Sequence, residues 1–227
     1  MRDWIEGDNI NYDYILRYIR RETPKRSGLL LEMEEYAKRQ GVPISQPESM
    51  RFLELIIKMS NAKNILEIGS AIGYSSMIMS QANDAKVTTI ELSEEMAKIA
   101  KENIEKANLS DKITLILGNA KEELAKINGK FDIIFIDAAK GQYMEFFEHC
   151  RRLLRVGGII VSDNVLYKGM TATDELVVHR KITIVRRLRS YLDMLRDSRE
   201  FSSCIIPIGD GVALSFRESN DAEQKTK

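Results

Sequence analysis

The sequence predicts an α/β fold in which a doubly wound, mostly parallel sheet of seven strands is covered by helices on both faces. The first observation is a strict alternation of short apolar runs and stretches of helical spacing from Asn64 onward, which is typical of a parallel sheet. The apolar runs are 64–69, 86–91, 112–117, 131–137 and 158–163, and the helical stretches between them lie near 73–83, 93–108, 119–128 and 142–155. The second observation is a pair of final runs, SSCIIPIG and VALSFR, on either side of Asp210-Gly211. Because that dipeptide favours a hairpin turn, we expect the sheet to end in an antiparallel pair.

Further helices are predicted before this alternation begins. They cover residues 9–22, 29–40 and 47–60, with a break at Thr23-Pro24 and an extended linker at 42–45. Pro47 suits the first turn of the third helix, where its missing amide loses no hydrogen bond. We therefore expect a single domain of 227 residues. Its parts are N-terminal helices over 1–60, an α/β core over 61–217 and a polar tail over 218–227.

Composition is that of a globular protein. Hydrophobic residues make up 44% of the chain and charged residues 30%, and no apolar run approaches the roughly 20 residues of a membrane span. The N-terminus lacks the apolar stretch of a signal peptide, so we expect no membrane partner and a cytoplasmic location. The two cysteines, Cys150 and Cys204, are not spaced as metal ligands and are expected to be core thiols.

Charge is balanced overall but unevenly distributed. The formal net charge is zero, which argues against indiscriminate coating of nucleic acid. Residues 151–199 nevertheless hold eleven basic against five acidic side chains. A long helix predicted over 174–196 there places Arg180 and Arg187 opposite its apolar face, and a second basic cluster, between residues 17 and 26, includes Arg20 and Arg21. Each cluster is either a solvated helix face or a surface over which an anionic substrate approaches.

The stretch NILEIGSAIGYS, from Asn64 to Ser75, has the pattern of a cofactor-binding turn. A buried strand passes through Gly69 and Gly73 into a helix, and glycines let backbone amides approach a ligand closely. Glu91 ends the next strand, where nucleotide-binding folds place a carboxylate that accepts hydrogen bonds from ribose hydroxyls. The alternative is a plain strand-to-helix corner.

Three oxygen-bearing side chains stand at predicted strand ends on the ligand side of the sheet. Asp137 closes FDIIFID, and Asp163 and Asn164 close GGIIVSDN. Two carboxylates and an amide oxygen suit magnesium or another small divalent ion, although acids at strand ends also cap helices. Lys140 follows Asp137 closely, and a lysine beside a metal ion can act as a general base; a solvated surface charge is the alternative.

At these residues the chain resembles a known family. The motifs LEIGSAIGYS, IIFIDAAKGQY, SDNVLYKG and IIPIGDG are similar to those of the catechol-O-methyltransferase-like family, which includes the caffeoyl-CoA O-methyltransferases. Within that family they look most like the bacterial tRNA 5-hydroxyuridine methyltransferases, which modify the wobble uridine. The resemblance covers about Tyr14 to Phe216 and implies a class I methyltransferase fold, which is Rossmann-like. It also implies a homodimer, with the N-terminal helices as contact.

The resemblance further implies S-adenosylmethionine as methyl donor and Mg²⁺, or another divalent cation such as Mn²⁺, as second cofactor. Cofactor contacts are implied for Ser45, Glu67, Gly69, Ser75, Glu91 and Asn119, metal ligation for Asp137, Asp163 and Asn164, and catalysis for Lys140 and Asp137, which also borders the cofactor. The sequence departs from the expected Gly-Asp-Ala at Gly118-Asn119-Ala120. An asparagine oxygen can still accept a hydrogen bond from the adenine amino group.

The reaction that this implies is O-methylation. The metal would lower the pKa of a substrate hydroxyl, Lys140 or bulk base would take the proton, and the oxygen would attack the sulfonium methyl in line. A tRNA anticodon loop bearing 5-hydroxyuridine and a small catechol-like molecule both offer two adjacent oxygens, so the site motifs do not separate them. The basic clusters, through Arg20, Arg21, Arg180 and Arg187, favour RNA.

Two other classes of function account for less of the sequence. An NAD-dependent dehydrogenase would also use a strand, a glycine turn and an acid, but the tight Gly-x-Gly-x-x-Gly is absent because Ser70 to Ile72 separate Gly69 from Gly73. A non-catalytic nucleic-acid-binding module would leave the clustered strand-end acids unexplained. An O-methyltransferase is therefore the preferred interpretation.

Overall fold

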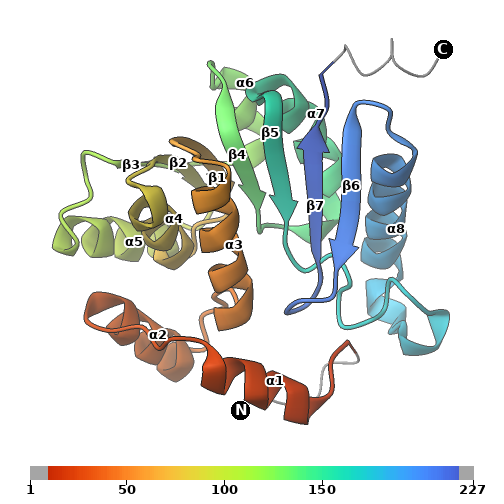
Figure 1. The fold of residues 1–227 in the computed structure, drawn as a ribbon, viewed down its shortest axis with the longest axis horizontal. Coiled ribbons are helices and arrows are strands. Elements are labelled where there is room, and N and C mark those ends of the chain that lie inside the picture. Colours follow the sequence, from red (N-terminus) through yellow and green to blue (C-terminus); the bar gives the residue numbers. More distant parts are fainter. Residues whose placement is uncertain (1–9, 220–227) are drawn as a thin grey trace.

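The computed structural model describes residues 10–219 and contains a seven-stranded sheet in the order β3-β2-β1-β4-β5-β7-β6 (Figure 1). Strands β1 to β5 pair in parallel, and β7 is antiparallel to both β5 and β6. The predicted fold class is confirmed, including the final antiparallel pair. The strands are β1 Asn64–Ile68, β2 Lys86–Glu91, β3 Ile113–Leu117, β4 Phe131–Ile136, β5 Leu154–Ser162, β6 Phe201–Ile206 and β7 Val212–Arg217. Most of the predicted polar tail, 220–227, lies outside the described residues.

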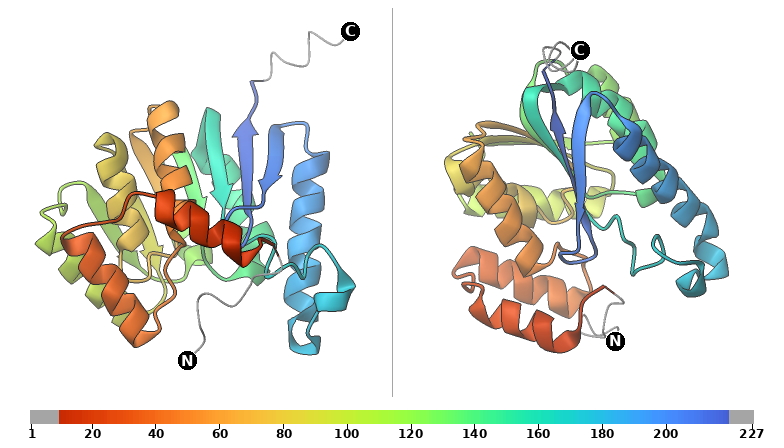
Figure 2. Two further views of the ribbon diagram at one scale, coloured as in Figure 1. Left: turned by 60° about the horizontal axis from the view of Figure 1, so that its bottom comes forward. Right: turned by 45° about the vertical axis from the view of Figure 1, so that its right-hand side comes forward.

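Helices cover both faces of the sheet (Figure 2). On one face lie α3 (Pro47–Met59), α4 (Tyr74–Asn83) and α5 (Glu94–Lys106), and on the other α6 (Ala120–Lys126), α7 (Tyr143–Leu153) and α8 (Ile182–Asp197). Successive side chains of a strand point to opposite faces, so Ile133 and Phe135 of β4 join the first core while Ile134 and Ile136 join the second. The near-continuous apolar runs of the sequence follow from this double burial.

The helix predicted over 174–196 is wrong in its first third. α8 begins only at Ile182, and two short 3₁₀ turns, η2 (Asp174–Leu176) and η3 (His179–Lys181), precede it. Val177 and Val178 between these turns are extended, with ψ of 114° and 133°, a conformation that suits β-branched residues. Val178 is 54% exposed and does not belong to a buried helix face. Strand β5 also begins earlier than predicted, directly after α7.

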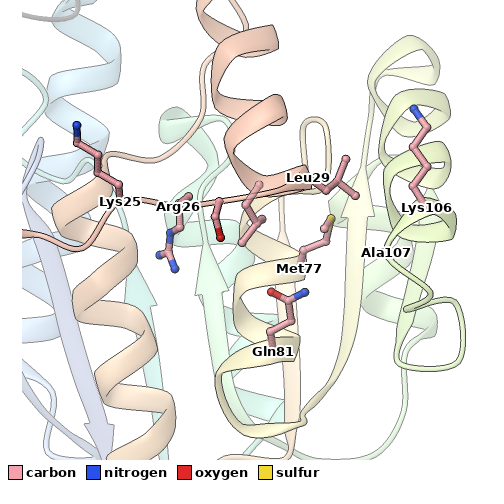
Figure 3. Close-up of a pocket in the computed structure, with 9 residues that line it drawn as sticks. Lys25, Arg26, Leu29, Met77, Gln81, Lys106 and Ala107 are labelled. Atoms are coloured by element: carbon pink, nitrogen blue, oxygen red, sulfur yellow. The ribbon is translucent and has the colours of Figure 1, made fainter.

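Helices α1 (Asp13–Glu22) and α2 (Leu29–Gln40) lie at the end of the sheet toward which β4 and β5 point (Figure 1). Two ion pairs fasten this segment to α3, Arg20–Glu48 and Arg26–Glu54, each at 2.8 Å. A cavity of about 360 Å³ lies between the start of α2 and helices α4 and α5 (Figure 3). No helix within residues 10–219 is long and apolar enough to cross a membrane.

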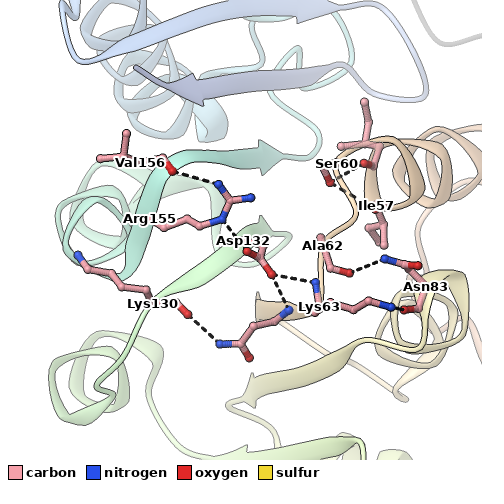
Figure 4. A network of polar contacts seen from close by, with 11 residues as sticks. Ile57, Ser60, Ala62, Lys63, Asn83, Lys130, Asp132, Arg155 and Val156 are labelled. Carbon is pink, nitrogen blue, oxygen red and sulfur yellow. Dashed lines mark hydrogen bonds and ion pairs between the residues drawn. The ribbon is translucent and has the colours of Figure 1, made fainter. Parts of the chain in front are cut away.

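A polar network anchors the opposite edge of the sheet, where β1, β4 and β5 begin (Figure 4). The carboxylate of Asp132 accepts hydrogen bonds from the backbone amides of Lys63 at 2.8 Å and Asn64 at 2.9 Å, and from Arg155 Nε at 2.6 Å. Burial favours the neutral acid, but these three donors outweigh it and lower the pKa of Asp132. One ionised carboxylate therefore joins the first residues of the three strands through hydrogen bonds.

Candidate active site

Backbone hydrogen bonds continue one residue past the ends of the parallel strands. Each donor is the residue that follows a strand, and each acceptor is a carbonyl at the end of the neighbouring strand. These exit bonds are Gly118 N to Glu91 O (2.8 Å), Gly69 N to Ile90 O (2.9 Å), Asp137 N to Ile68 O (3.0 Å) and Asp163 N to Ile136 O (2.9 Å). They place the strand-end residues singled out in the sequence along one edge of the sheet.

Asp137 and Asp163 are neighbours on that edge. Burial raises the pKa of both carboxyl groups, and for Asp163, which is 1% exposed, the charge of Asp137 raises it further. Asp163 Oδ1 accepts a hydrogen bond from the amide of Asn164 at 2.7 Å, and Asp137 Oδ2 accepts one from the hydroxyl of Ser45 at 3.1 Å. Asp163 is buried and Asp137 half-buried. Two like charges in such a place are costly together, and a bound cation would relieve that cost.

The oxygen donors at this edge fit a hard divalent ion. Within residues 10–219 no group of three or more His, Cys, Asp or Glu side chains is placed to hold a metal. An ion here would therefore take Asp137, Asp163, the amide oxygen of Asn164 and water, a donor set that suits Mg²⁺ or Mn²⁺. Asn164 has a φ of 56°, in the left-handed region that asparagine tolerates better than most residues.

Lys140 lies within electrostatic reach of both acids. It begins the 3₁₀ turn η1 (Lys140–Gln142), just after β4, and its charge lowers the pKa of Asp137 and of Asp163 against the larger effect of burial. The same turn is held from α8, because Arg187 Nη1 donates a hydrogen bond to the carbonyl of Gly141 at 3.1 Å. Arg187 thus contacts the loop that carries Lys140.

Glu67 is fully buried on the α4 side of β1. Ser76 donates a hydrogen bond to Oε2, whereas Oε1 has no partner in the described protein. Burial raises the pKa of Glu67 to about 7, against the opposing effect of nearby hydroxyl groups, among them Ser75 and Ser76. A buried acceptor without a donor is what a ligand ammonium group would satisfy, so this position fits the methionine end of the expected cofactor.

Gly69 is where the main chain turns away from the sheet. Its φ is +98°, and a Cβ added there would lie 2.2 Å from the carbonyl oxygen of Asp137. Any larger residue would push β1 and β4 apart at this edge. The glycine therefore keeps the two strand ends in contact. Its amide already donates to the carbonyl of Ile90, so any contact of Gly69 with the cofactor stays a prediction and would not use that amide.

Glu91 braces the glycine turn. One carboxylate oxygen accepts from the amide of Ala71 and the other from the amide of Ser93, both at 2.8 Å. Each oxygen keeps a further lone pair for a ribose hydroxyl. Asn119 caps α6, with its side-chain oxygen accepting from Lys121 N at 3.0 Å, and the residue is exposed.

The four arginines proposed for RNA occupy different environments. Arg20 pairs with the buried Glu48 and also contacts Gln46. Arg21 is exposed, pairs with Glu22 and lies 5.0 Å above the Tyr18 ring. Arg180, on η3, is exposed, and Arg187 holds the Lys140 turn. Arg21, Arg180 and Arg187 are all exposed, but Arg187 is hydrogen-bonded to Gly141, which leaves Arg21 and Arg180 more accessible to a phosphate.

Tyr143 supports the site but was not singled out by the sequence reasoning. Its hydroxyl is buried and donates to the carbonyl of Asp163 at 2.8 Å, and its ring meets Tyr191 edge-on with centroids 5.6 Å apart. Tyr191 in turn hydrogen-bonds Ser162 at 2.7 Å. The only sequence signal was its place in the motif IIFIDAAKGQY. The cavity of Figure 3 is a separate feature, because no candidate site residue lines it.

Comparison with known proteins connects this geometry to a chemistry. The family model described as O-methyltransferase matches residues 15–218. Caffeoyl-CoA O-methyltransferase 2 of Petunia hybrida is 32% identical over 210 residues, which cover 86% of this chain and 86% of that protein. A catechol O-methyltransferase of Niastella koreensis is 36% identical over 152 residues, covering 64% and 68%. The structure of an O-methyltransferase from Bacillus cereus in complex with SAH matches with a TM-score of 0.80 and 28% identity, covering 90% of this chain and 97% of that one.

Proposed function

The chain belongs to the O-methyltransferase family, as an S-adenosylmethionine-dependent enzyme of the caffeoyl-CoA and catechol type, and we propose a role for each candidate residue at the carboxyl ends of its strands. Glu67, Gly69, Ser75 and Glu91 hold the methyl donor, with Ser45 above it and Asn119 near the adenine. Asp137, Asp163 and Asn164 hold a divalent ion, and Lys140 is the general base.

The strongest support for the metal is the acid pair. Asp137 and Asp163 end adjacent strands, burial raises the pKa of both, and Lys140 is the cation whose charge acts on both of them. A site with this excess of buried acid binds a small divalent cation favourably. Asn164, directly after Asp163, adds a neutral oxygen without a further charge.

The chemistry assigned to the site is transfer of a methyl group to a hydroxyl oxygen. A bound divalent ion would lower the pKa of that hydroxyl. Lys140 accepts the proton, and the edge residues hold oxygen and methyl carbon in line. A bond forms between oxygen and the methyl carbon while the sulfur–carbon bond breaks and its electron pair returns to sulfur. The products are a methyl ether, S-adenosylhomocysteine and a proton.

For the substrate we propose 5-hydroxyuridine at the wobble position of a tRNA, converted to 5-methoxyuridine. Basic side chains near the loop that follows Asn164 support an anionic substrate. Lys181 Nζ of η3 lies 5.9 Å from the ring centroid of Tyr167, in the loop that follows Asn164, and Arg180 next to it is exposed. An RNA loop splays its bases while its phosphates contact such cations. The four motifs quoted from the sequence point the same way.

A small catechol-like molecule is the second candidate. The printed names of the relatives from Petunia hybrida and Niastella koreensis, which refer to caffeoyl-CoA and catechol, support it. Such a molecule also presents two adjacent oxygens, so the same acid pair serves either candidate.

The metal proposal is tested by chelation. Exhaustive treatment with EDTA should abolish turnover, and Mg²⁺ or Mn²⁺ should restore it. Asp163→Ala should lose turnover that no added ion restores, whereas Asp193→Ala, at an exposed carboxylate of α8, should behave as wild type. Full activity after chelation would overturn the metal assignment.

The substrate is tested with labelled S-adenosylmethionine and three acceptors: tRNA from a strain that lacks wobble methylation, caffeoyl-CoA and catechol. Nucleosides from the digested tRNA are then identified by mass. Arg180→Glu should raise the apparent KM for tRNA at least several-fold and leave catechol methylation unchanged, while Arg199→Glu, an exposed arginine beyond the other end of α8, serves as control. Arg187 is avoided because its substitution would disturb the Lys140 turn. Methylation of catechol but of no tRNA nucleoside would favour the small molecule.

A further inference from the structure

The segment that follows β5 has a strained backbone. Asn164, Tyr167 and Lys168 have φ values of 56°, 46° and 58°, in the left-handed region that costs free energy for residues other than glycine. The intrinsic backbone preferences of three such residues within five positions do not favour this left-handed conformation. The segment needs contacts from elsewhere in the chain to stay next to Asp163.

The turn between β6 and β7 supplies those contacts. Val165 N donates to Gly211 O at 2.9 Å, and Leu166 N donates to Asp210 O at 3.0 Å. The amide of Lys168 donates to the side-chain oxygen Oδ1 of Asp210. Two of the three bonds are between backbone atoms. Only the bond from the Lys168 amide to the Asp210 carboxylate depends on the identity of a side chain. We call these three bonds together the latch.

The turn is also tightly seated. A Cβ added at Gly211 would lie 2.4 Å from Leu166 Cγ, and one added at Gly209 would lie 2.4 Å from Ser49 Oγ on α3. The turn is thus wedged between the strained segment and α3. Movement of the turn would release the segment on one side of the site.

We propose that Asp210 is a positioning residue for the divalent-ion site, because its carboxylate holds the strained segment that carries Asn164 beside Asp163. This inference rests on the proposed metal site. It gives a role to Asp210 in the IIPIGDG motif, which the sequence indicated as a hairpin turn and as one of the four family-like motifs, without a role for this residue. Asp210 also carries a negative charge, so the effect of its position has to be separated from the effect of its charge.

Two conservative variants separate position from charge. Asp210→Asn keeps an acceptor oxygen in place and removes the charge, whereas Asp210→Glu keeps the charge and displaces the acceptor by one methylene. Mn²⁺ affinity is measured on the substrate-free protein by electron paramagnetic resonance. Hydrogen exchange of the Lys168 amide reports the latch, and S-adenosylmethionine affinity reports an intact fold.

Asp210→Glu should weaken Mn²⁺ binding on the order of 10-fold or more, as loss of a group that orients a metal ligand does, and should speed exchange at Lys168. Asp210→Asn should stay within a few-fold of wild type in both. Glu218→Ala removes a carboxylate that accepts from Ser202 at the other end of the same hairpin and should change neither.

Wild-type Mn²⁺ affinity in Asp210→Glu would overturn this inference while leaving the metal site standing. A larger loss in Asp210→Asn than in Asp210→Glu would also overturn it, because charge rather than position would then matter. A wild-type protein that binds no Mn²⁺ would overturn the proposed site itself.

Discussion

Replacing Glu67 by glutamine should remove a pH dependence of stability from the cofactor-free protein. The carboxyl is fully buried, only Oε2 is hydrogen-bonded, and its pKa is raised from the ordinary 4.5 to about 7. The folded state therefore holds a proton on Glu67 at a pH where the unfolded state has released it. The free energy of unfolding contributed by this group is complete below pH 4.5 and falls until about pH 7.

The size of the effect follows from that interval. A step from 4.5 to about 7 corresponds to about 3 kcal/mol in total, of which about 2.5 kcal/mol falls between pH 5 and pH 8. Glutamine cannot ionise, so the difference in free energy of unfolding between wild type and Glu67→Gln should shift by about 2.5 kcal/mol in favour of the variant over that range. Titrating groups that do not interact with Glu67 cancel in the difference.

The assay is urea unfolding followed by far-ultraviolet circular dichroism at pH 5, 6, 7 and 8. Ser76→Ala is the matched control, because it leaves the carboxyl but removes a hydroxyl that stabilises its charge. Without that hydroxyl the pKa of Glu67 in the folded state should rise further. The free energy of unfolding of Ser76→Ala should therefore continue to fall at pH values where that of wild type has levelled off. If the difference in free energy of unfolding between wild type and Glu67→Gln is the same at pH 5 and pH 8, Glu67 ionises normally in the folded protein and its pKa is not raised.

Two further outcomes are expected. Glu91→Ala should weaken S-adenosylmethionine binding by about 1–3 kcal/mol, since it removes both the proposed ribose acceptor and the brace on Ala71; unchanged affinity by calorimetry would limit Glu91 to the turn. Asp132→Ala should lower the free energy of unfolding by about 2–3 kcal/mol because three donors lose their acceptor, with cofactor affinity retained. Equal loss of stability and cofactor affinity would contradict the separation of the two sheet edges.

The fold was predictable because a strand buried on both faces of the sheet is apolar at nearly every position, and that run is visible in the sequence. The run FDIIFID is apolar on both faces, and the structure buries Ile133 and Ile134 on opposite sides of β4. The start of α8 was not predictable from spacing. Val178 fits a helical stripe in the sequence, yet it is exposed in an extended stretch, and only tertiary packing distinguishes the two.

Some residues of the candidate site could likewise be predicted from the sequence, and others could not. Topology alone brings residues after β4 and β5 to one edge, so Asp137 and Asp163 were identifiable from their positions. The partners of the arginines were not, because the contacts of Arg20 with Glu48 and of Arg187 with Gly141 join residues 28 and 46 positions apart and have no local signature. Tyr143 and Asp210 escaped functional assignment for the same reason.

The exit bonds between strand ends have a consequence for how the chain can change in length. An insertion of one residue before such a bond would turn every later side chain of that strand to the opposite face of the sheet. An insertion after it only lengthens a loop. Beyond Asp163, the contacts of residues 165–168 with the hairpin turn restrict the length of the loop. Beyond Glu91, the bond from the Ser93 amide to the Glu91 carboxylate restricts it as well. Insertions and deletions should therefore avoid the residues directly after Glu91 and Asp163.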